Sequence, residues 1–176
     1  DGEEYDARKE LGDWNRTGYD DTNWIPAGRV SIPSGTLRAQ MMPGMKVTES
    51  LKPVSIRKQG DKHILDIGQN MAGWLRIRIK GQAGDSIRLR FAERLQPDGE
   101  IFTKNLRDAH CTDIYVVSGR EPQDTTWAPR FVYHGFRYVE ISGYPNAKTE
   151  DFTAEVVDDE MAHTGTFTCS DETLNK

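Results

Sequence analysis

Apolar and polar residues alternate along two neighbouring segments of the chain, residues 74–80 and 86–92. The apolar positions are Leu75, Ile77, Ile79, Ile87, Leu89 and Phe91. The positions between them carry Arg76, Arg78, Lys80, Arg88 and Arg90. Successive side chains of a strand point to opposite faces, so this period of two predicts strands with one buried and one solvated face. Residues 81–85 supply the glycines of a hairpin loop, which predicts that the two strands pair antiparallel.

Shorter segments of the same kind recur through residues 37–168, separated by Gly, Pro and Asp at short intervals. They predict further strands at residues 54–57, 63–67, 112–118, 135–142, 152–158 and 165–169. No long amphipathic helix is predicted within residues 37–168. Many short strands with frequent turns are typical of an all-β fold, and we expect an antiparallel β-sandwich of jelly-roll type.

The two ends of the chain differ from its centre. Residues 1–36 are rich in turn-forming residues, and we predict the tail of a preceding β-domain followed by a linker. The sandwich is expected to occupy residues 37–169. Ser170 can then cap the first turn of a helix, because the acidic side chains that follow it suit the positive end of a helix dipole. The pattern at residues 170–176 therefore predicts the entry to a helical region.

Composition and charge narrow the function classes. Of the 176 residues, 29% are charged and 36% hydrophobic, which is typical of a soluble, folded chain. The net charge of −5 argues against a nucleic-acid partner, because phosphate binding requires a basic surface. No stretch approaches the roughly 18 consecutive apolar residues of a membrane span, so no membrane partner is expected. The compartment, whether cytoplasm, periplasm or the outside, stays open.

Neither a metal nor a cofactor is predicted. Cys111 and Cys169 lack metal-ligand spacing and are interpreted as free thiols. The acidic turn at residues 20–23 offers oxygen ligands of the kind calcium takes, but an Asx turn explains the same residues.

Several motifs occur in a specific order. They are DIGQNMAGW at residues 66–74, FAERLQPDG at 91–99, TKNLR at 103–107, WAPRF at 127–131, HGFRY at 134–138, GYP at 143–145 and TGTF at 164–167. Together they resemble the β-sandwich region of bacterial α-L-rhamnosidases, an inverting glycoside hydrolase family with a helical catalytic barrel. Residues 5–8 and 20–24 are similar to the end of the jelly-roll domain that precedes this sandwich, and residues 174–176 to the entry of the barrel.

The resemblance implies a concanavalin-like domain within an enzyme that releases terminal α-L-rhamnose from glycans or glycosides. Because acidic residues of the (α/α)6 barrel carry out hydrolysis in this family, it implies no catalytic residue in this segment. It implies as partners the catalytic helical barrel and the N-terminal β-domain of the same polypeptide, with a rhamnose-containing glycan as a candidate ligand. We expect an accessory domain that braces the barrel, with a carbohydrate-binding module or a purely structural spacer as alternatives.

The acidic run at residues 155–160 is superficially similar to the catalytic strand of concanavalin-like endoglycanases. That strand needs its acids at alternate positions on one face. Here Asp158 and Glu160 share a face while Glu155 lies on the other. We therefore interpret the run as a strand end or a solvated turn.

Sugar binding uses an aromatic platform with polar groups beside it. The candidates for sugar binding or for contact between domains are Trp74, Asn105, Arg107, Asp113, His134 and Arg137. Trp74 begins a strand beside a glycine, and the case for its burial is the weakest among the tryptophans. Residues 98–110 form the longest irregular stretch of the predicted sandwich, and such loops commonly carry function.

Overall fold

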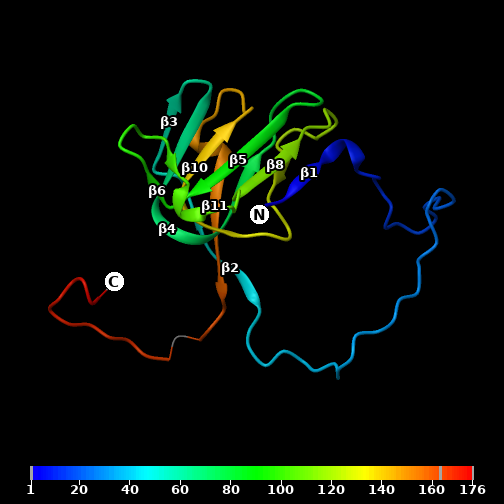
Figure 1. Ribbon diagram of the computed structural model, residues 1–176, viewed down its shortest axis with the longest axis horizontal. Coiled ribbons are helices and arrows are strands. Elements are labelled where there is room, and N and C mark those ends of the chain that lie inside the picture. The colour runs from blue at the N-terminus through cyan, green and yellow to red at the C-terminus, as the bar shows by residue number, and fades with distance from the viewer. Residues whose placement is uncertain (1, 163, 176) are drawn as a thin grey trace.

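The computed structural model describes residues 2–162 and 164–175, and these ranges are almost entirely β-strand and loop (Figure 1). The strands are β1 (Glu4–Asp6), β2 (Met45–Leu51), β3 (Ser55–Gln59), β4 (Lys62–Arg78), β5 (Ser86–Ala92), β6 (Arg94–Leu95), β7 (Ile101–Phe102), β8 (Thr112–Val116), β9 (Thr126–Trp127), β10 (His134–Ser142) and β11 (Phe152–Asp159). Three short 3-10 helices are η1 (Ala7–Lys9), η2 (Lys104–Leu106) and η3 (Thr149–Asp151). The predicted all-β class is confirmed.

One curled sheet holds most of these strands. Its order is β1-β8-β5-β10-β4-β11-β2, and β3 and β9 also pair with β4. The pairs are antiparallel except for β1 with β8, which run parallel. The first half of the 17-residue β4 pairs with β3, and its second half pairs with β11 and β9. β10 pairs with both halves, between His63 and Gly73. Because one long strand serves both halves, the sheet curls on itself and encloses a core.

The predicted hairpin between residues 74–80 and 86–92 is wrong. The second half of β4 pairs with β11, whereas β5 lies between β10 and β8. Residues 81–85 therefore carry the chain from one half of the sandwich to the other. The predicted faces are nonetheless correct, since the apolar positions Leu75 and Ile87 are both 0% exposed. Alternation reports which face is buried, and it does not report which strand lies alongside.

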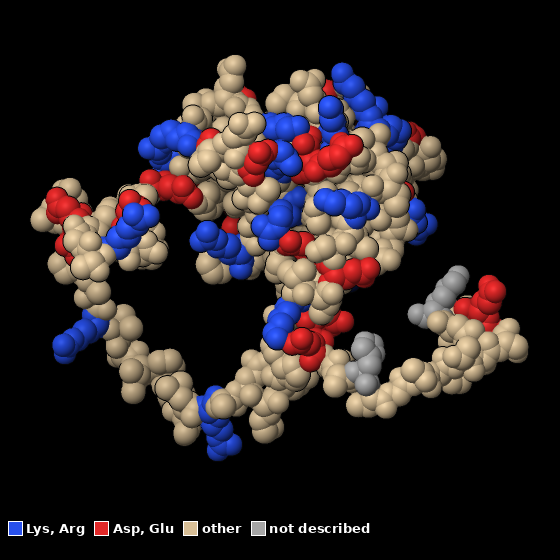
Figure 2. Space-filling model, turned by 180° about the vertical axis from the view of Figure 1, so that it is seen from behind, with Lys and Arg blue, Asp and Glu red and all other residues tan. Residues whose placement is uncertain are grey.

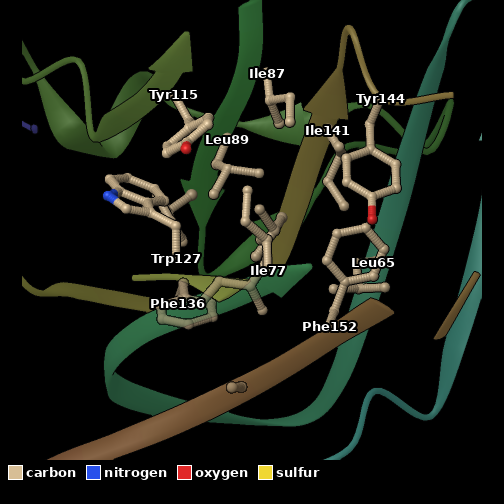
Figure 3. Close-up of a cluster of buried hydrophobic side chains, with 14 of the residues drawn as sticks. Leu65, Ile77, Ile87, Leu89, Tyr115, Trp127, Phe136, Ile141, Tyr144 and Phe152 are labelled. Atoms are coloured by element: carbon tan, nitrogen blue, oxygen red, sulfur yellow. The ribbon is translucent and has the colours of Figure 1, made fainter. Parts of the chain in front are cut away.

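The core lies between the two halves of the curled sheet (Figure 3). Its side chains include Leu65, Ile77, Ile87, Leu89, Phe136, Ile141 and Phe152, which come from β4, β5, β10 and β11. Burial of each such side chain contributes about 1.5–3 kcal/mol. Tyr144 enters the core with its ring, and its hydroxyl donates a hydrogen bond of 2.8 Å to the carbonyl oxygen of Arg78. The hydroxyl at the end of this buried ring therefore has a hydrogen-bond partner.

The segment between η1 and β2 and the C-terminal residues extend away from the sandwich (Figure 1). β1 joins the sheet beside β8, but residues 10–44 contain no strand or helix. Residues 160–162 and 164–175 likewise form neither, so the strand predicted at residues 165–169 is wrong. At residues 170–175 there is a turn, in which the backbone N–H of Leu174 donates to the carbonyl of Asp171. Residue 176 lies outside the described residues, and the domain boundaries stay predictions.

In the ranges that the structure describes, none of the helices has the length and apolar character needed to cross a membrane.

Candidate functional site

The motif at residues 66–74 forms a large irregularity in β4. Phe136 of β10 pairs with Met71, but Tyr138 pairs with Asp66, so residues 67–70 stand opposite the single residue Arg137. Bulges of this kind bend a strand and redirect its side chains, and they are common next to functional sites. The motifs at residues 66–74 and 134–138 therefore lie on neighbouring strands and pair with each other on both sides of this bulge.

An ion pair closes this bulge. The guanidinium of Arg137 donates two hydrogen bonds, of 2.9 and 3.0 Å, to the two carboxylate oxygens of Asp66. The backbone N–H of Gly68, which has φ of 92°, donates a third to the same carboxylate at 2.7 Å. These bonds favour the charged carboxylate, and the hydrogen bonds from Arg137 are the main reason that the pKa of Asp66 lies below its usual value.

Replacing Asp66 by Asn is expected to reduce the acid sensitivity of the fold. A carboxylate whose pKa is lowered by folding stabilises the native state above its unfolded pKa of about 3.9, and this contribution is lost as the pH falls through the lower folded pKa. Urea midpoints measured between about pH 5 and pH 2 should therefore fall less steeply in Asp66→Asn than in the unmodified chain. Asp61→Asn, in the exposed β3–β4 turn, is the matched control. Equal slopes for Asp66→Asn and the unmodified chain would contradict this assignment.

A polar cluster lies beside the bulge. Glu93, which follows β5, accepts hydrogen bonds from the side-chain amides of Asn70 at 3.1 Å and Asn105 at 3.3 Å. All three residues are exposed. The cluster joins the bulge in β4 to η2, so the predicted candidate Asn105 lies at this edge of the sandwich.

Asp113 and His134 form a buried pair at the start of β10. The Nε2–H of His134 donates to Oδ1 of Asp113 at 3.0 Å, and the imidazole stacks on Phe91 with ring centroids 4.3 Å apart. The backbone N–H of Glu3 donates to the same oxygen at 3.0 Å. Because Asp113 is 0% and His134 5% exposed, neither side chain can touch a sugar directly. The pair instead ties β8, β10 and the segment leading into β1 together.

Trp74 is half-buried and belongs to a charged cluster on the outer face of β4. Its indole N–H donates to Glu155 at 2.5 Å, and Arg76 donates to the same carboxylate at 2.7 and 2.9 Å. Three of the other basic residues between residues 74 and 92 are also paired with acids. The pairs are Arg78 with Asp124, Lys80 with Asp151 and Arg90 with Glu140. The interpretation of these arginines and lysines as a solvated face is supported, and Figure 2 shows positive and negative side chains interspersed over the sandwich.

Two hollows flank β1. One, of about 1030 Å³, lies against residues 9–16 and includes the half-exposed Trp14 and Trp24, whose ring centroids are 6.3 Å apart. The other, of about 620 Å³, is lined by the predicted candidate Arg107 together with Arg88 and His110. Neither hollow contains Trp74, His134 or Arg137. The six candidates therefore lie in separate places, apart from the Asp113–His134 pair.

Within residues 2–162 and 164–175 no group of three or more His, Cys, Asp or Glu side chains is arranged to hold a metal ion. The carboxylate of Asp20 accepts the backbone N–H of Thr22 at 3.1 Å, which is the hydrogen bond of an Asx turn. The sequence analysis did not identify Asn70, Glu93 and Asn105 as one cluster beside a bulge. Gly68 inside a strand was the available signal, because glycine in a strand interior commonly marks a bulge.

Comparison with known proteins agrees with this architecture. Residues 56–158 match the family described as bacterial alpha-L-rhamnosidase concanavalin-like domain, and residues 1–49 match the alpha-L-rhamnosidase N-terminal domain. A curled β-sandwich of this build is a domain of a glycoside hydrolase family. The chain belongs to the bacterial α-L-rhamnosidase family.

Individual relatives are much longer than this chain. An alpha-L-rhamnosidase of Streptomyces avermitilis is 41% identical in an alignment of 186 positions that covers 99% of this chain and 17% of that protein. The solved alpha-L-rhamnosidase of Dictyoglumus thermophilum superimposes with a TM-score of 0.92 at 36% identity, over 98% of this chain and 20% of that one. The Streptomyces avermitilis enzyme, solved in complex with L-rhamnose, gives a TM-score of 0.82 at 38% identity, over 89% and 15%. The chain thus spans a fifth or less of these relatives.

Proposed function

We propose that this chain is a non-catalytic accessory domain of a longer α-L-rhamnosidase, in which it braces the catalytic helical barrel. The longer protein would release terminal α-L-rhamnose from glycans or glycosides. This proposal is supported by the names of the relatives and by their length, of which the chain covers 15–20%.

The main support for the accessory role is that the carboxylates on the strands are paired with basic side chains. Glu140 is 2% exposed and lies between Lys62 and Arg90, at 3.2 and 3.0 Å. Asp66 and Glu155 each accept two hydrogen bonds from an arginine. An inverting glycosidase needs a general acid that keeps its proton and a general base about 6.5–9.5 Å away across the substrate. Each of these carboxylates is instead bound by basic side chains of the sandwich itself, so it is suited to hold the fold together.

Hydrolysis of an aryl α-L-rhamnoside tests the proposal. The longer polypeptide is expected to release the aryl group, and the purified 176-residue chain is expected to release none above the buffer rate. Turnover by the 176-residue chain would refute the accessory role. A longer polypeptide that leaves the rhamnoside intact would refute the proposed activity.

The alternative role of a carbohydrate-binding module has weaker support. Trp74, the most promising aromatic platform, has its indole N–H engaged by Glu155 and stands in neither hollow beside β1. Calorimetric titration with L-rhamnose and rhamnosylated oligosaccharides distinguishes the two roles. Saturable binding that is lost in Trp74→Ala would favour the module, and flat traces would favour the accessory domain.

A further inference from the structure

The loop between β9 and β10 presents two aromatic side chains to solvent. Phe131 is 93% and Tyr133 55% exposed, whereas His134, which follows them, is 5% exposed. Single exposed apolar residues are ordinary on protein surfaces. Two aromatic residues at alternate positions of one loop present a larger apolar contact, and aromatic side chains are enriched where protein surfaces bind one another.

The backbone of this loop is held in place. Oε2 of Glu3 accepts hydrogen bonds from the consecutive backbone N–H groups of Arg130 at 2.8 Å and Phe131 at 2.9 Å. Glu3 is itself fixed, because its N–H donates to the buried Asp113 and its carbonyl accepts the N–H of Ile114 at 2.8 Å. The loop is thus connected through one carboxylate to the sheet. Fixing the backbone of an exposed loop before binding lowers the entropy that binding costs.

The loop also lies on a particular side of the sandwich. In the sheet His134 pairs with Gly73, Gly73 pairs with Val156, and Val156 pairs with Glu49 of β2. Tyr133 is therefore adjacent to the β10 end of a row of paired residues that crosses β10, β4, β11 and β2. Figure 1 shows the loop passing beneath the sheet, on the side from which β2 and β11 leave it.

Further apolar side chains are exposed where β2 and β11 leave the sheet. Met45 and Val47 of β2 are 50% and 43% exposed. They lie opposite Asp159 and Val157 at the end of β11. This side of the molecule has the apolar character of a surface that another domain covers.

We propose that Phe131 and Tyr133, positioned by Glu3, are the anchor on which the helical catalytic domain of the same polypeptide docks. This inference rests on the proposed function. The choice of occupant follows from connectivity: β11 leads directly into residues 160–176, so a domain that follows is tethered on the side where the two aromatic residues are exposed. The relatives, five or more times as long as this chain, contain the additional residues that such a domain requires.

Thiol labelling in the longer polypeptide tests the anchor. Phe131→Cys is compared with Val54→Cys, since Val54 is another exposed apolar residue of the sandwich, at 66%. Position 131 is more exposed than position 54 in the 176-residue chain, so maleimide labelling of that chain should be faster at position 131. If the catalytic domain covers the loop, labelling at position 131 requires local opening and should be at least about tenfold slower than at position 54. Mass spectrometry of the labelled peptides separates both positions from the native cysteines.

Labelling at position 131 as fast as at position 54 would overturn the proposal. Protection that disappears on dilution would assign the loop to a second copy of the protein and would overturn it equally. If Phe131→Cys does not fold, Tyr133→Cys is used in its place with the same expectation. Rhamnosidase activity is measured on the same preparations, so an active enzyme that labels rapidly at position 131 refutes the anchor alone.

Discussion

Replacing Gly143 by Ala is expected to destabilise the sandwich by about 4 kcal/mol or more, which is exceptional for a single substitution. Gly143 follows β10 with φ of 70°, and a Cβ atom there would lie 2.0 Å from the carbonyl oxygen of Ser86 at the start of β5. No side-chain rotation relieves a contact between Cβ and backbone, so β5 and β10 would have to separate. Urea unfolding of the 176-residue chain measures the loss.

Gly60→Ala is the matched control. Gly60 has nearly the same backbone conformation, with φ of 62°, but a Cβ atom there would meet nothing within 4 Å. Only the left-handed conformation is then penalised, which costs about 1–2 kcal/mol. Equal losses in the two variants would show that close packing at the β5–β10 end contributes nothing beyond backbone strain.

Replacing Phe136 by Ala is expected to cost about 3–5 kcal/mol, because the ring leaves a cavity that the surrounding side chains fill only in part. Phe136 is 0% exposed and packs edge-on against Phe91, with ring centroids 4.9 Å apart. The control is Phe131→Ala, which removes an equal ring that is 93% exposed. In the 176-residue chain this control should change the free energy of unfolding by less than about 0.5 kcal/mol.

The same two variants in the longer polypeptide have a different expected result. There Phe131→Ala should lower the midpoint of thermal unfolding, since the proposed anchor is buried by the neighbouring domain. If Phe131→Ala lowered the stability of the 176-residue chain as much as Phe136→Ala does, Phe131 would instead be packed within the sandwich itself. Calorimetry of the four proteins makes the comparison.

The sequence contained enough information to predict the buried faces of the strands and the all-β class. Leu75, Ile77, Ile87 and Leu89 all lie in the core, as alternation predicts. The sequence did not show which strands pair with one another, because pairing is decided by packing between segments far apart in the chain. β4 is the clearest case, since two separately predicted strands, at residues 63–67 and 74–80, belong to one long strand that bends between the halves of the sheet.

For the candidate residues, too, the sequence predicted one part and the tertiary structure determined the rest. The motifs that contain Asp66 and Arg137 were found from the sequence, and they predicted the family that the comparisons show. That these two side chains form an ion pair depends on the register between β4 and β10, which includes a bulge whose position Gly68 suggests but whose length no local pattern encodes. The burial of Asp113 and His134 likewise depends on β1 and Phe91 covering them. Local chemistry identified these residues, and tertiary structure determines what they contact.

The parallel pairing of β1 with β8 also has a consequence for the order in which the protein is made. Glu3 and its partner Asp113 are 110 positions apart, so at about 5–20 residues per second a ribosome needs on the order of 5–20 seconds to supply the partner of the first strand. β2 waits a similar time for β11. During this interval β1 is an unpaired strand, and its neighbouring acids Glu3, Glu4 and Asp6 carry charges that discourage pairing with other nascent chains. The acidic residues around β1 thus protect the sandwich while it is still incomplete.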